Sequence, residues 1–262
     1  MAIVLIKELQ SSKKQYAVPR KTLIDNPEEA VVEEKKIEEM DVVFLMDRFG
    51  YAKTVDVSVY ERNKEAADTE NRYILTCKNT DKICIFTNKG QMHLLKVLDL
   101  PYGKFRDKGI PIDNLSNYNS SEENFIYIIN LGAIIHSRLL FGTKTAMLKM
   151  VDGSEFDVAK RTTASTKLNE DDELLIVHAM TGEETVVMQS EKEMFLRIEA
   201  STIPEKKKGA VGVRGMKLNA GDALSNIYVL DGESEQTVEV KGKEVVLNRL
   251  RVGNRDTKGT KR

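Results

Sequence analysis

Short apolar runs separated by tight polar turns dominate the chain from Asp41 onward. Ahead of them, IVLIKELQSSKKQY has helical spacing at Ile3, Ile6 and Leu9, and Pro19 forbids the helix from continuing far. Runs rich in Val, Ile, Leu and Phe, bounded by Gly, Asn, Asp and Thr, are typical of β-hairpins. Five segments show this pattern: DVVFLMDRFGYAK, KICIFTNKGQMHLLKVL, RLLFGTKTAMLKMV, ETVVMQSEKEMFLRI and QTVEVKGKEVVLNRL. We therefore expect a short N-terminal helix followed by a set of hairpins.

The five hairpin segments repeat along the chain. Their turns fall at Gly50, Gly90, Ala146, Glu193 and Gly242, which are 40, 56, 47 and 49 residues apart. An apolar residue follows each turn ten positions later, at Tyr60, Leu100, Phe156, Ile203 and Val252. A second register supports the repeat, because KLNEDDEL (167–174) recurs fifty residues later as KLNAGDAL (217–224). Gly182 and Gly232 share the same offset.

A strand-built repeat of this length indicates an all-β, propeller-like array of about five four-stranded blades. Each small sheet would bury its faces against its neighbours. We assign residues 1–24 to a helical connector and residues 25–262 to the β-domain. The repeat units fall around 41–70, 71–120, 126–170, 171–220 and 221–262. The alternative is a β-sandwich made of unrelated hairpins.

Charge is distributed unevenly although the net charge is only −1. Residues 25–41 carry eight acids against two bases, and residues 241–262 carry eight bases against two acids. After the apolar position at ten, most units pass into a basic segment: PYGKFRDKGIPI, AKRTTASTKL, EKKKGAVGVRGMKL and VGNRDTKGTKR. All but AKRTTASTKL contain glycine. The basic segments therefore form a set rather than an isolated motif.

Equivalent loops of a ring lie on one rim, so these segments would trace a discontinuous basic track suited to the phosphates of curved duplex DNA. Glycine would let the backbone approach a phosphate closely. No base-reading helix is evident, so we expect contact without sequence preference. For any single lysine, a solvated loop position is the competing interpretation. The candidate DNA-binding residues are Lys53, Lys104, Arg106, Lys108, Lys160, Arg161, Lys206, Lys207, Lys208, Arg214, Lys217, Arg255 and Lys258.

Other chemistries find little support. GAVGVRG lacks the G-x-G-x-x-G spacing of a dinucleotide site, and no G-K-[ST] triplet marks a nucleoside triphosphate loop. His93, His136 and His178 stand in different units, and Cys77 and Cys84 are too few for a zinc site. We expect no catalytic residue and no metal site. The acidic turn at 171–173 is interpreted as solvated surface, and Cys84 as a core residue. With no run of 18 apolar residues, we expect a cytoplasmic protein with no membrane contact. The expected binding to DNA would make it nucleoid-associated.

Three segments carry a family resemblance: FGYAKTVDVSVY, ICIFTNKGQMHLLKVLDLP and GVRGMKLNAGDAL. Their order of strand, turn, strand and basic glycine loop resembles the C-terminal β-pinwheel in the A subunits of the bacterial type IIA topoisomerases, DNA gyrase and topoisomerase IV. IKELQSSKKQYAVPRKTLI resembles the helix and connector that leave the breakage-reunion core of those subunits. The resemblance covers essentially the whole chain.

The resemblance implies an accessory domain that binds and bends double-stranded DNA on its basic rim. Such a domain presents DNA segments to the catalytic core for ATP-dependent strand passage. The implied partners are duplex DNA, the remainder of the A subunit and the B subunit that carries the ATPase. The active-site tyrosine and the ATPase are not recognisable here. The implication is therefore no cofactor in this chain, with ATP and magnesium acting on other domains. The competing hypothesis is a propeller-like protein-interaction scaffold that does not bind DNA.

Two departures from the gyrase pattern favour behaviour like that of topoisomerase IV. Gyrase pinwheels carry a Q-R-R-G-G-K-G type box after the first unit, where this chain reads YERNKEAADTE. They also usually have six blades, whereas five units are found here. The topoisomerase IV domain guides DNA without strong chiral wrapping. A divergent gyrase, or loss of a sixth blade, is the alternative explanation of these departures.

Overall fold

The computed structural model describes residues 2–16, 18 and 37–262, in two compact units, Met1–Ile37 and Glu38–Arg262. In the first unit, helix α1 (Ala2–Tyr16) confirms the expected N-terminal helix, and its Val4, Ile6 and Leu9 side chains are exposed. The rest of the predicted connector and most of the acidic segment lie outside the described residues. We call Glu38–Arg262 the β-unit and describe it by itself.

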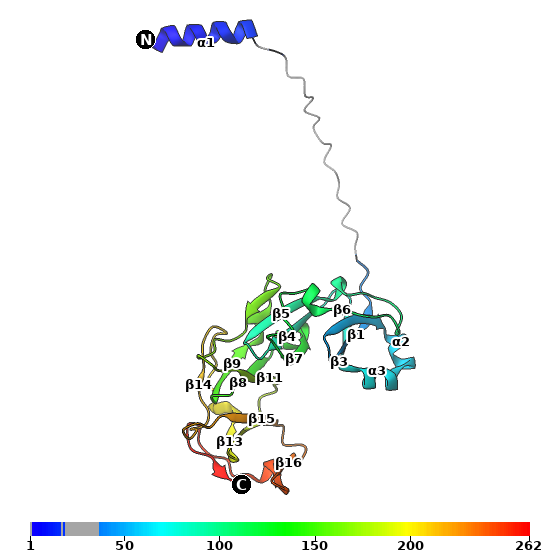
Figure 1. Ribbon diagram of the computed structural model, residues 1–262, viewed down its shortest axis with the longest axis vertical. Helices are drawn as coiled ribbons and strands as arrows, with labels where there is room; N and C mark the ends of the chain where they lie inside the picture. The colour runs from blue at the N-terminus through cyan, green and yellow to red at the C-terminus, as the bar shows by residue number, and fades with distance from the viewer. Residues whose placement is uncertain (1, 17, 19–36) are drawn as a thin grey trace. The chain divides into compact units, whose positions relative to one another are not determined.

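All five predicted hairpins form in the β-unit (Figure 1). They are β1 (Asp41–Asp47) with β2 (Tyr51–Asp56), β4 (Lys82–Thr87) with β5 (Gln91–Lys96), β8 (Arg138–Thr143) with β9 (Met147–Asp152), β12 (Thr185–Ser190) with β13 (Met194–Glu199), and β16 (Thr237–Val240) with β17 (Lys243–Val246). Gly50, Gly90 and Gly242 have positive φ in the tight turns, and Ala146 and Glu193 adopt the same left-handed conformation. The turn positions chosen as repeat origins are therefore structurally equivalent.

Each of the first four hairpins gains two strands from later in the chain. The first strand of the hairpin pairs with a longer strand that follows it: β3 (Asn71–Lys78), β7 (Phe125–Asn130), β11 (Leu174–Met180) or β15 (Leu224–Leu230). The second strand pairs with a short segment that comes after the next hairpin: β6 (Ile110–Pro111), β10 (Thr162–Ala164), β14 (Val213–Arg214) or β18 (Thr260–Lys261). All these pairings are antiparallel. Consecutive units are thus interlocked by strand exchange.

The fifth hairpin differs from the other four. In the described residues β16 and β17 pair with each other as a two-stranded sheet. The expected five four-stranded blades are therefore four such blades and one hairpin. The face of this hairpin that carries Val238 and Val245 packs on the fourth sheet. Glu239 and Glu244 lie opposite each other on the other face, which is polar and exposed.

Hydrophobic clusters join consecutive sheets. The first and second sheets share a cluster that includes Phe44 and Ile85, and the second and third share one that includes Phe86 and Phe141. The Phe86 and Phe141 rings meet edge-on at 5.9 Å, a geometry worth about 1 kcal/mol beyond area burial. The third and fourth sheets share a cluster built around Leu148. Adjacent residues of one strand, such as Ile85 and Phe86 in β4, therefore face different clusters, which explains why the strand is apolar on both faces.

Among the described residues no blade precedes the first sheet, and the segment after its hairpin covers the outer face of this sheet. That segment folds as α2 (Val57–Arg62) and α3 (Lys64–Glu70), and its Val59 and Ala67 pack on Val43 and Leu45. Asp56 caps the first of these helices by accepting from the Ser58 backbone N–H. The acidic sequence of the first unit therefore forms an end cap rather than a basic loop.

Short 3₁₀ turns follow the other four hairpins: η1 (Val97–Asp99), η3 (Gly153–Phe156), η4 (Ala200–Thr202) and η5 (Leu247–Arg249), with η2 (Ile112–Asn114) and α4 (Leu131–Ile134) in the connections. Leu100, Phe156 and Ile203 are buried at these turns, as the repeat predicts. In the fifth unit Leu250 is the buried residue, and Val252, ten positions after the turn, is 38% exposed. The strands of that hairpin are shorter, so the equivalent position comes earlier.

Cys84 is fully buried, as expected for a core residue, and burial raises the pKa of its thiol to about 12. Burial likewise raises the pKa of Cys77 to about 11. Both cysteines are free. Among the described residues, no helix is long and apolar enough to span a membrane, and no cluster of His, Cys, Asp or Glu has the geometry of a metal site.

Candidate nucleic-acid interface

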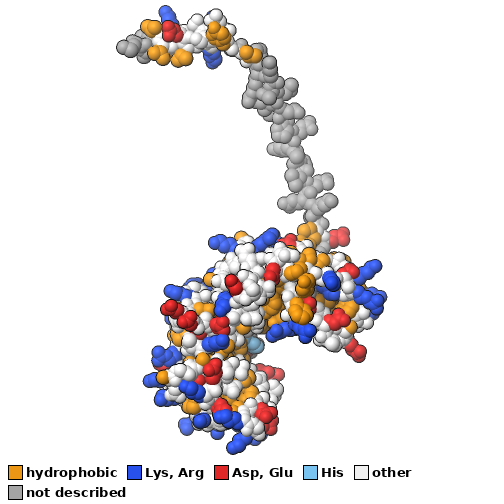
Figure 2. All heavy atoms as spheres, in the orientation of Figure 1, with side chains coloured by type: hydrophobic (Ala, Val, Ile, Leu, Met, Phe, Trp, Pro, Cys, Tyr) orange, Lys and Arg blue, Asp and Glu red, His pale blue; other side chains and the backbone are white. Residues whose placement is uncertain are grey.

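The four basic segments lie at equivalent edges of the four complete sheets. Each one supplies or adjoins a short edge strand, β6, β10, β14 or β18, on the second strand of the preceding hairpin. The register is the same in three sheets: Ile110 pairs with Ala52, Val213 with Leu148 and Thr260 with Phe195. The chain therefore places one basic loop at the same edge of each successive sheet. Figure 2 shows Lys and Arg side chains along the margin of the β-unit, with acidic side chains between them.

Three glycines of these loops, Gly109, Gly212 and Gly259, pack against the protein itself, whereas Gly209 faces open space. A Cβ on Gly109 would meet the Ala52 carbonyl oxygen at 2.5 Å, and one on Gly212 would meet that of Leu148 at 2.6 Å. Gly259 lies in the same way against the backbone of Phe195. The close approach that these three glycines permit is therefore to the preceding hairpin, and contact of their backbone with a phosphate stays a prediction. In AKRTTASTKL, the basic segment without glycine, Thr162 occupies the position that corresponds to Gly109. The edge strand of this segment, β10, is longer than β6.

Most of the predicted DNA-binding side chains are exposed. Lys53, Lys208 and Arg255 are the partly buried members of the set. The exposed members are Lys104, Arg106, Lys108, Lys160, Arg161, Lys206, Lys207, Arg214, Lys217 and Lys258. The structure therefore leaves ten of the thirteen predicted side chains facing solvent at the loop edge. Their contact with DNA stays a prediction.

The loops of the fourth and fifth units contact each other. Arg214 forms an ion pair with Asp256 at 3.4 Å, and Arg255 donates to the Arg214 carbonyl oxygen at 2.9 Å. The Lys217 backbone N–H donates to the Thr257 carbonyl oxygen at 2.9 Å. Arg255 thus fixes the position of a neighbouring loop, whereas Arg214 and Lys217 keep their side chains exposed.

The lysine triplet of the fourth unit lies beside Glu155, at the turn that follows the third hairpin. Lys207 reaches this carboxylate at 3.4 Å, and its side chain is 88% exposed. The Lys208 backbone N–H donates to the same carboxylate at 2.9 Å, and the Lys208 ammonium donates to the Glu155 carbonyl oxygen. Lys208 is therefore bound to the protein, and Lys206 and Lys207 are the members of the triplet that can reach a phosphate.

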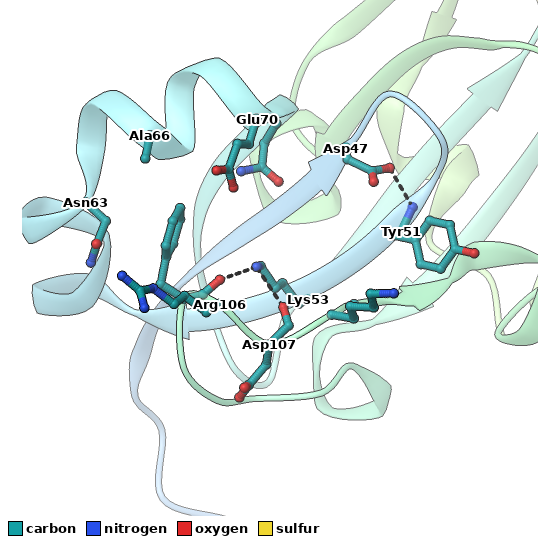
Figure 3. Close-up of a pocket in the computed structure, with 12 residues that line it drawn as sticks. Asp47, Tyr51, Lys53, Asn63, Ala66, Glu70, Arg106 and Asp107 are labelled. Atoms are coloured by element: carbon teal, nitrogen blue, oxygen red, sulfur yellow. Dashed lines mark hydrogen bonds between the residues drawn. The ribbon is translucent and has the colours of Figure 1, made fainter.

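Lys53 does not point to solvent. Its ammonium donates to the carbonyl oxygens of Phe105 and Asp107, the latter at 2.9 Å, within the loop that carries Arg106 and Lys108 (Figure 3). This contact lies at the mouth of a cleft of about 720 Å³ between α3 and the loop. The cleft is lined by acidic and basic groups alike, including Asp47 and Glu70. Lys53 is thus placed to hold a basic loop, and direct contact with DNA stays a prediction for it.

Two aspartates, Asp172 and Asp222, hold hairpin turns. Asp172 belongs to the acidic turn at 171–173, and the prediction that this turn is solvated surface is wrong for Asp172. Asp172 is buried and accepts hydrogen bonds from the backbone N–H and hydroxyl of Thr145, at 3.0 and 2.5 Å. Asp222, fifty residues later, accepts from the Ser190 hydroxyl and the Lys192 N–H. The offset of fifty in the sequence pairs these two aspartates, and that match was the available signal for their role.

His93 confirms the interpretation as a structural histidine. It is buried in β5, its Nδ1 lies 3.1 Å from the Thr162 hydroxyl, and its Nε2 lies 3.2 Å from the Glu123 carboxylate. Thr87 donates to the same carboxylate at 2.6 Å. These bonds attach β10 and the connection before β7 to the second sheet.

A family described as DNA gyrase C-terminal domain, beta-propeller, matches residues 137–178 and 184–231 of this chain. The chain is similar to the DNA gyrase A subunit of Lawsonia intracellularis, with 28% identity over 276 residues, 98% of this chain and 33% of the relative. The corresponding gyrase A subunit of Staphylococcus epidermidis is 29% identical over 273 residues, 97% of this chain and 30% of the relative. The chain thus spans about a third of the length of these relatives.

Solved structures share the fold. A C-terminal domain of DNA topoisomerase IV superposes with a TM-score of 0.76 at 22% identity, over 86% of this chain and 73% of that one. The C-terminal domain of E. coli ParC gives a TM-score of 0.70 at 15% identity, over 85% of this chain and 94% of that one. A DNA gyrase A C-terminal domain gives 0.57 at 17% identity, over 84% and 76%.

Proposed function

We propose that this chain, whose fold resembles the C-terminal domains of topoisomerase IV and DNA gyrase A subunits, binds duplex DNA and bends it along its four basic loops. One observation carries this proposal: four loops rich in Lys and Arg lie at the same edge of four consecutive interlocked sheets. A single loop could serve solubility alone. Repetition at one edge spaces positive charge along a path, which matches the regular negative charge of a duplex.

Binding of this kind is dominated by phosphate contacts. The exposed lysines and arginines neutralise phosphates and release counterions, and among the described residues the interface offers no helix of a length and placement suited to a major groove. We therefore propose recognition through the backbone and the deformability of the duplex. A smooth bend of 40–90° over 20–30 base pairs costs roughly 1–6 kcal/mol, which additional phosphate contacts on successive loops can offset.

We propose further that the domain acts within a larger enzyme. The curated relatives are gyrase A subunits about three times as long as this chain. In that setting the domain would guide a DNA segment toward the remainder of the A subunit, for strand passage driven by the ATPase of the B subunit. The domain itself would need no cofactor, and ATP and magnesium would act elsewhere in the enzyme.

Within the family we propose behaviour like that of topoisomerase IV, in which DNA is guided without strong chiral wrapping. The supporting observation is that helices α2 and α3, with the acids Glu61, Glu65 and Glu70, occupy the place where gyrase carries its basic box. A nicked plasmid ligated with the domain bound measures this directly. A linking-number change near zero supports the proposal, and a large change per bound domain contradicts it.

The test of DNA binding is a titration of labelled linear duplex, followed by fluorescence anisotropy at several salt concentrations. We expect affinity to fall steeply and linearly on a logarithmic salt scale, with little difference between sequences. Energy transfer between dyes at the two ends of the duplex reports the bend. Absence of binding at low salt contradicts the proposal and favours a protein-interaction scaffold.

A further inference from the structure

Lys149 is a buried lysine in the middle of β9, and it does not belong to the predicted DNA-binding set. Its side chain is enclosed, with 1% of the residue surface exposed. Its ammonium donates to the carbonyl oxygens of Lys208 at 2.7 Å, Ala210 at 2.8 Å and Lys207 at 3.4 Å. An ammonium has three donors, so the loop of the fourth unit supplies as many acceptors as Lys149 has N–H groups.

The same arrangement occurs in the first sheet. Lys53 stands three residues after the turn at Gly50, as Lys149 stands three residues after the turn at Ala146. Lys53 donates to the carbonyls four and two residues before Gly109, those of Phe105 and Asp107. Lys149 donates to the carbonyls four and two residues before Gly212. Identical offsets from the closely packed glycine show that the two contacts are one repeated feature.

The other two complete sheets attach their basic segments differently. His93 fills the equivalent position in the second sheet and contacts the Thr162 hydroxyl. In the fourth sheet Arg197, one residue further along, donates to the carbonyl oxygens of Asn248 and Leu250, at 2.5 and 3.4 Å. The lysine contact is thus found for two of the three equivalent glycine-containing loops, 102–109 and 205–212, whereas the loop at 252–259 faces Leu196 at the equivalent position.

We propose that Lys149 and Lys53 are positioning residues for DNA binding: each binds the backbone of one basic loop from the protein side and so turns the loop's exposed cations toward the duplex. The inference rests on the proposed DNA-binding function. It assigns these two lysines a role distinct from phosphate contact. In the fourth unit the cations that Lys149 positions are Lys206 and Lys207.

The burial of Lys149 has an energetic cost that its contacts offset. Burial lowers the pKa of Lys149 to about 8, and the nearby Glu155 carboxylate acts in the opposite direction. The Phe141 ring lies 5.3 Å from the ammonium and adds a favourable cation–π contact. A methionine at this position would satisfy packing alone. A lysine is required only if the three carbonyls of the loop must be bound.

The test is Lys149→Met, which keeps the length and apolar stem of the side chain and removes the ammonium. We expect duplex affinity at about 0.1 M salt to fall roughly 3- to 10-fold, and the logarithmic salt slope to shrink by about 1 to 2. The matched control is Lys192→Met. Lys192 also donates to a carbonyl oxygen, that of Ala220 at 2.8 Å, but in a turn without predicted DNA contacts. This control removes the same charge and should change affinity less than about twofold.

A double-mutant cycle separates positioning from general destabilisation. In a Lys206→Gln, Lys207→Gln background the cations that Lys149 positions are already absent, so adding Lys149→Met should change affinity less than about twofold. A structural defect would lower affinity equally in both backgrounds, and that result would overturn the proposal. Lys53→Met is the second variant. It should release the loop with Lys104 and Arg106, and it keeps the proposal testable if Lys149→Met fails to fold.

Hydrogen exchange without DNA distinguishes this inference from the proposed function. In Lys149→Met, amides within 207–212 should exchange faster while those of β12 and β13 stay unchanged. If the wild-type domain fails to bind DNA but this local effect appears, the proposed function fails and the loop contact stands. Unchanged exchange in 207–212 overturns the positioning role whether or not DNA binds.

Discussion

Removing the exposed cations of the fourth loop should weaken DNA binding by an amount that the structure allows us to work out. The variant is Lys206→Gln, Lys207→Gln, Arg214→Gln. Each phosphate contact changes the logarithmic salt slope by about 0.9, so three contacts change it by about 2 to 3. Relative to about 1 M salt, where phosphate contacts contribute little, this slope makes each contact worth about eightfold in affinity at 0.1 M salt. Loss of three contacts therefore costs about 500-fold.

Existing ion pairs reduce this figure. Lys207 pairs with Glu155 and Arg214 with Asp256, each at 3.4 Å, and both cations are largely exposed to solvent. An exposed pair contributes up to about 1 kcal/mol, or about fivefold in affinity, which each cation would lose on turning to a phosphate. The expected loss is therefore about 20- to 500-fold.

The assay is anisotropy of a labelled duplex between about 50 and 200 mM salt, where the wild-type slope is well determined. The matched control neutralises Lys64, Lys78 and Lys243, which lie outside the four loops, on α3, on β3 and in the fifth hairpin. It has the same net charge as the variant. If variant and control shift the salt slope equally, bulk charge rather than the loop track accounts for binding, and our reasoning is refuted.

Three further substitutions test the fold. Burial by itself would raise the pKa of Glu184, but hydrogen bonds, led by those from Thr181, lower it to about 2. The carboxylate therefore stabilises the fold above about pH 4.5, and this contribution is lost as pH falls toward about 2. In urea titrations, Glu184→Gln should lower the free energy of unfolding by about 1–2 kcal/mol at pH 7 and by much less near pH 3. Gly212→Ala, with φ at +104° and the Leu148 carbonyl 2.6 Å from the added Cβ, should cost about 2–4 kcal/mol, and a loss below about 0.5 kcal/mol in the same assay contradicts the packing described. Asp172→Ala should cost about 2 kcal/mol by thermal unfolding, and wild-type stability would show that the turn does not depend on this carboxylate.

The hairpins were predictable because their signals are local. Apolar runs and positive-φ turn residues stand next to each other in the sequence, so all five hairpins were found from the pattern. The all-β array followed from the repeat, including the offset of fifty that pairs Asp172 with Asp222. The basic loops at equivalent edges also followed from the repeat, since equivalent positions of a repeat occupy equivalent places.

The strand exchange between units was not predictable from the same pattern. Edge strands such as β6 and β14 contain two residues each, too few for any periodicity. The packing of Gly109 and Gly212 on a neighbouring hairpin therefore cannot be inferred from the sequence, in which a glycine beside lysines is equally consistent with a position facing DNA. The repeat placed a lysine at equivalent positions in β2 and β9, but a lysine within an apolar run gives no indication of the distant carbonyls that bind it.

The role of the first unit also depends on three-dimensional context. A segment after a hairpin docks on the preceding sheet, and in the part of the chain that the structure describes no sheet precedes the first hairpin. YERNKEAADTE is therefore free to fold as helices over the exposed apolar face. The acidic segment therefore covers the first sheet and does not form another basic loop.

Lysine footprinting on bound duplex tests the central claim most directly. Acetylation by a small reagent, read by mass spectrometry with and without DNA, reports each lysine separately. We predict protection at Lys104, Lys160, Lys206 and Lys258, one for each loop, and unchanged reactivity at Lys64 on α3. Protection confined to one loop, or protection of Lys64 with the loops unchanged, would contradict a DNA path along the four sheet edges.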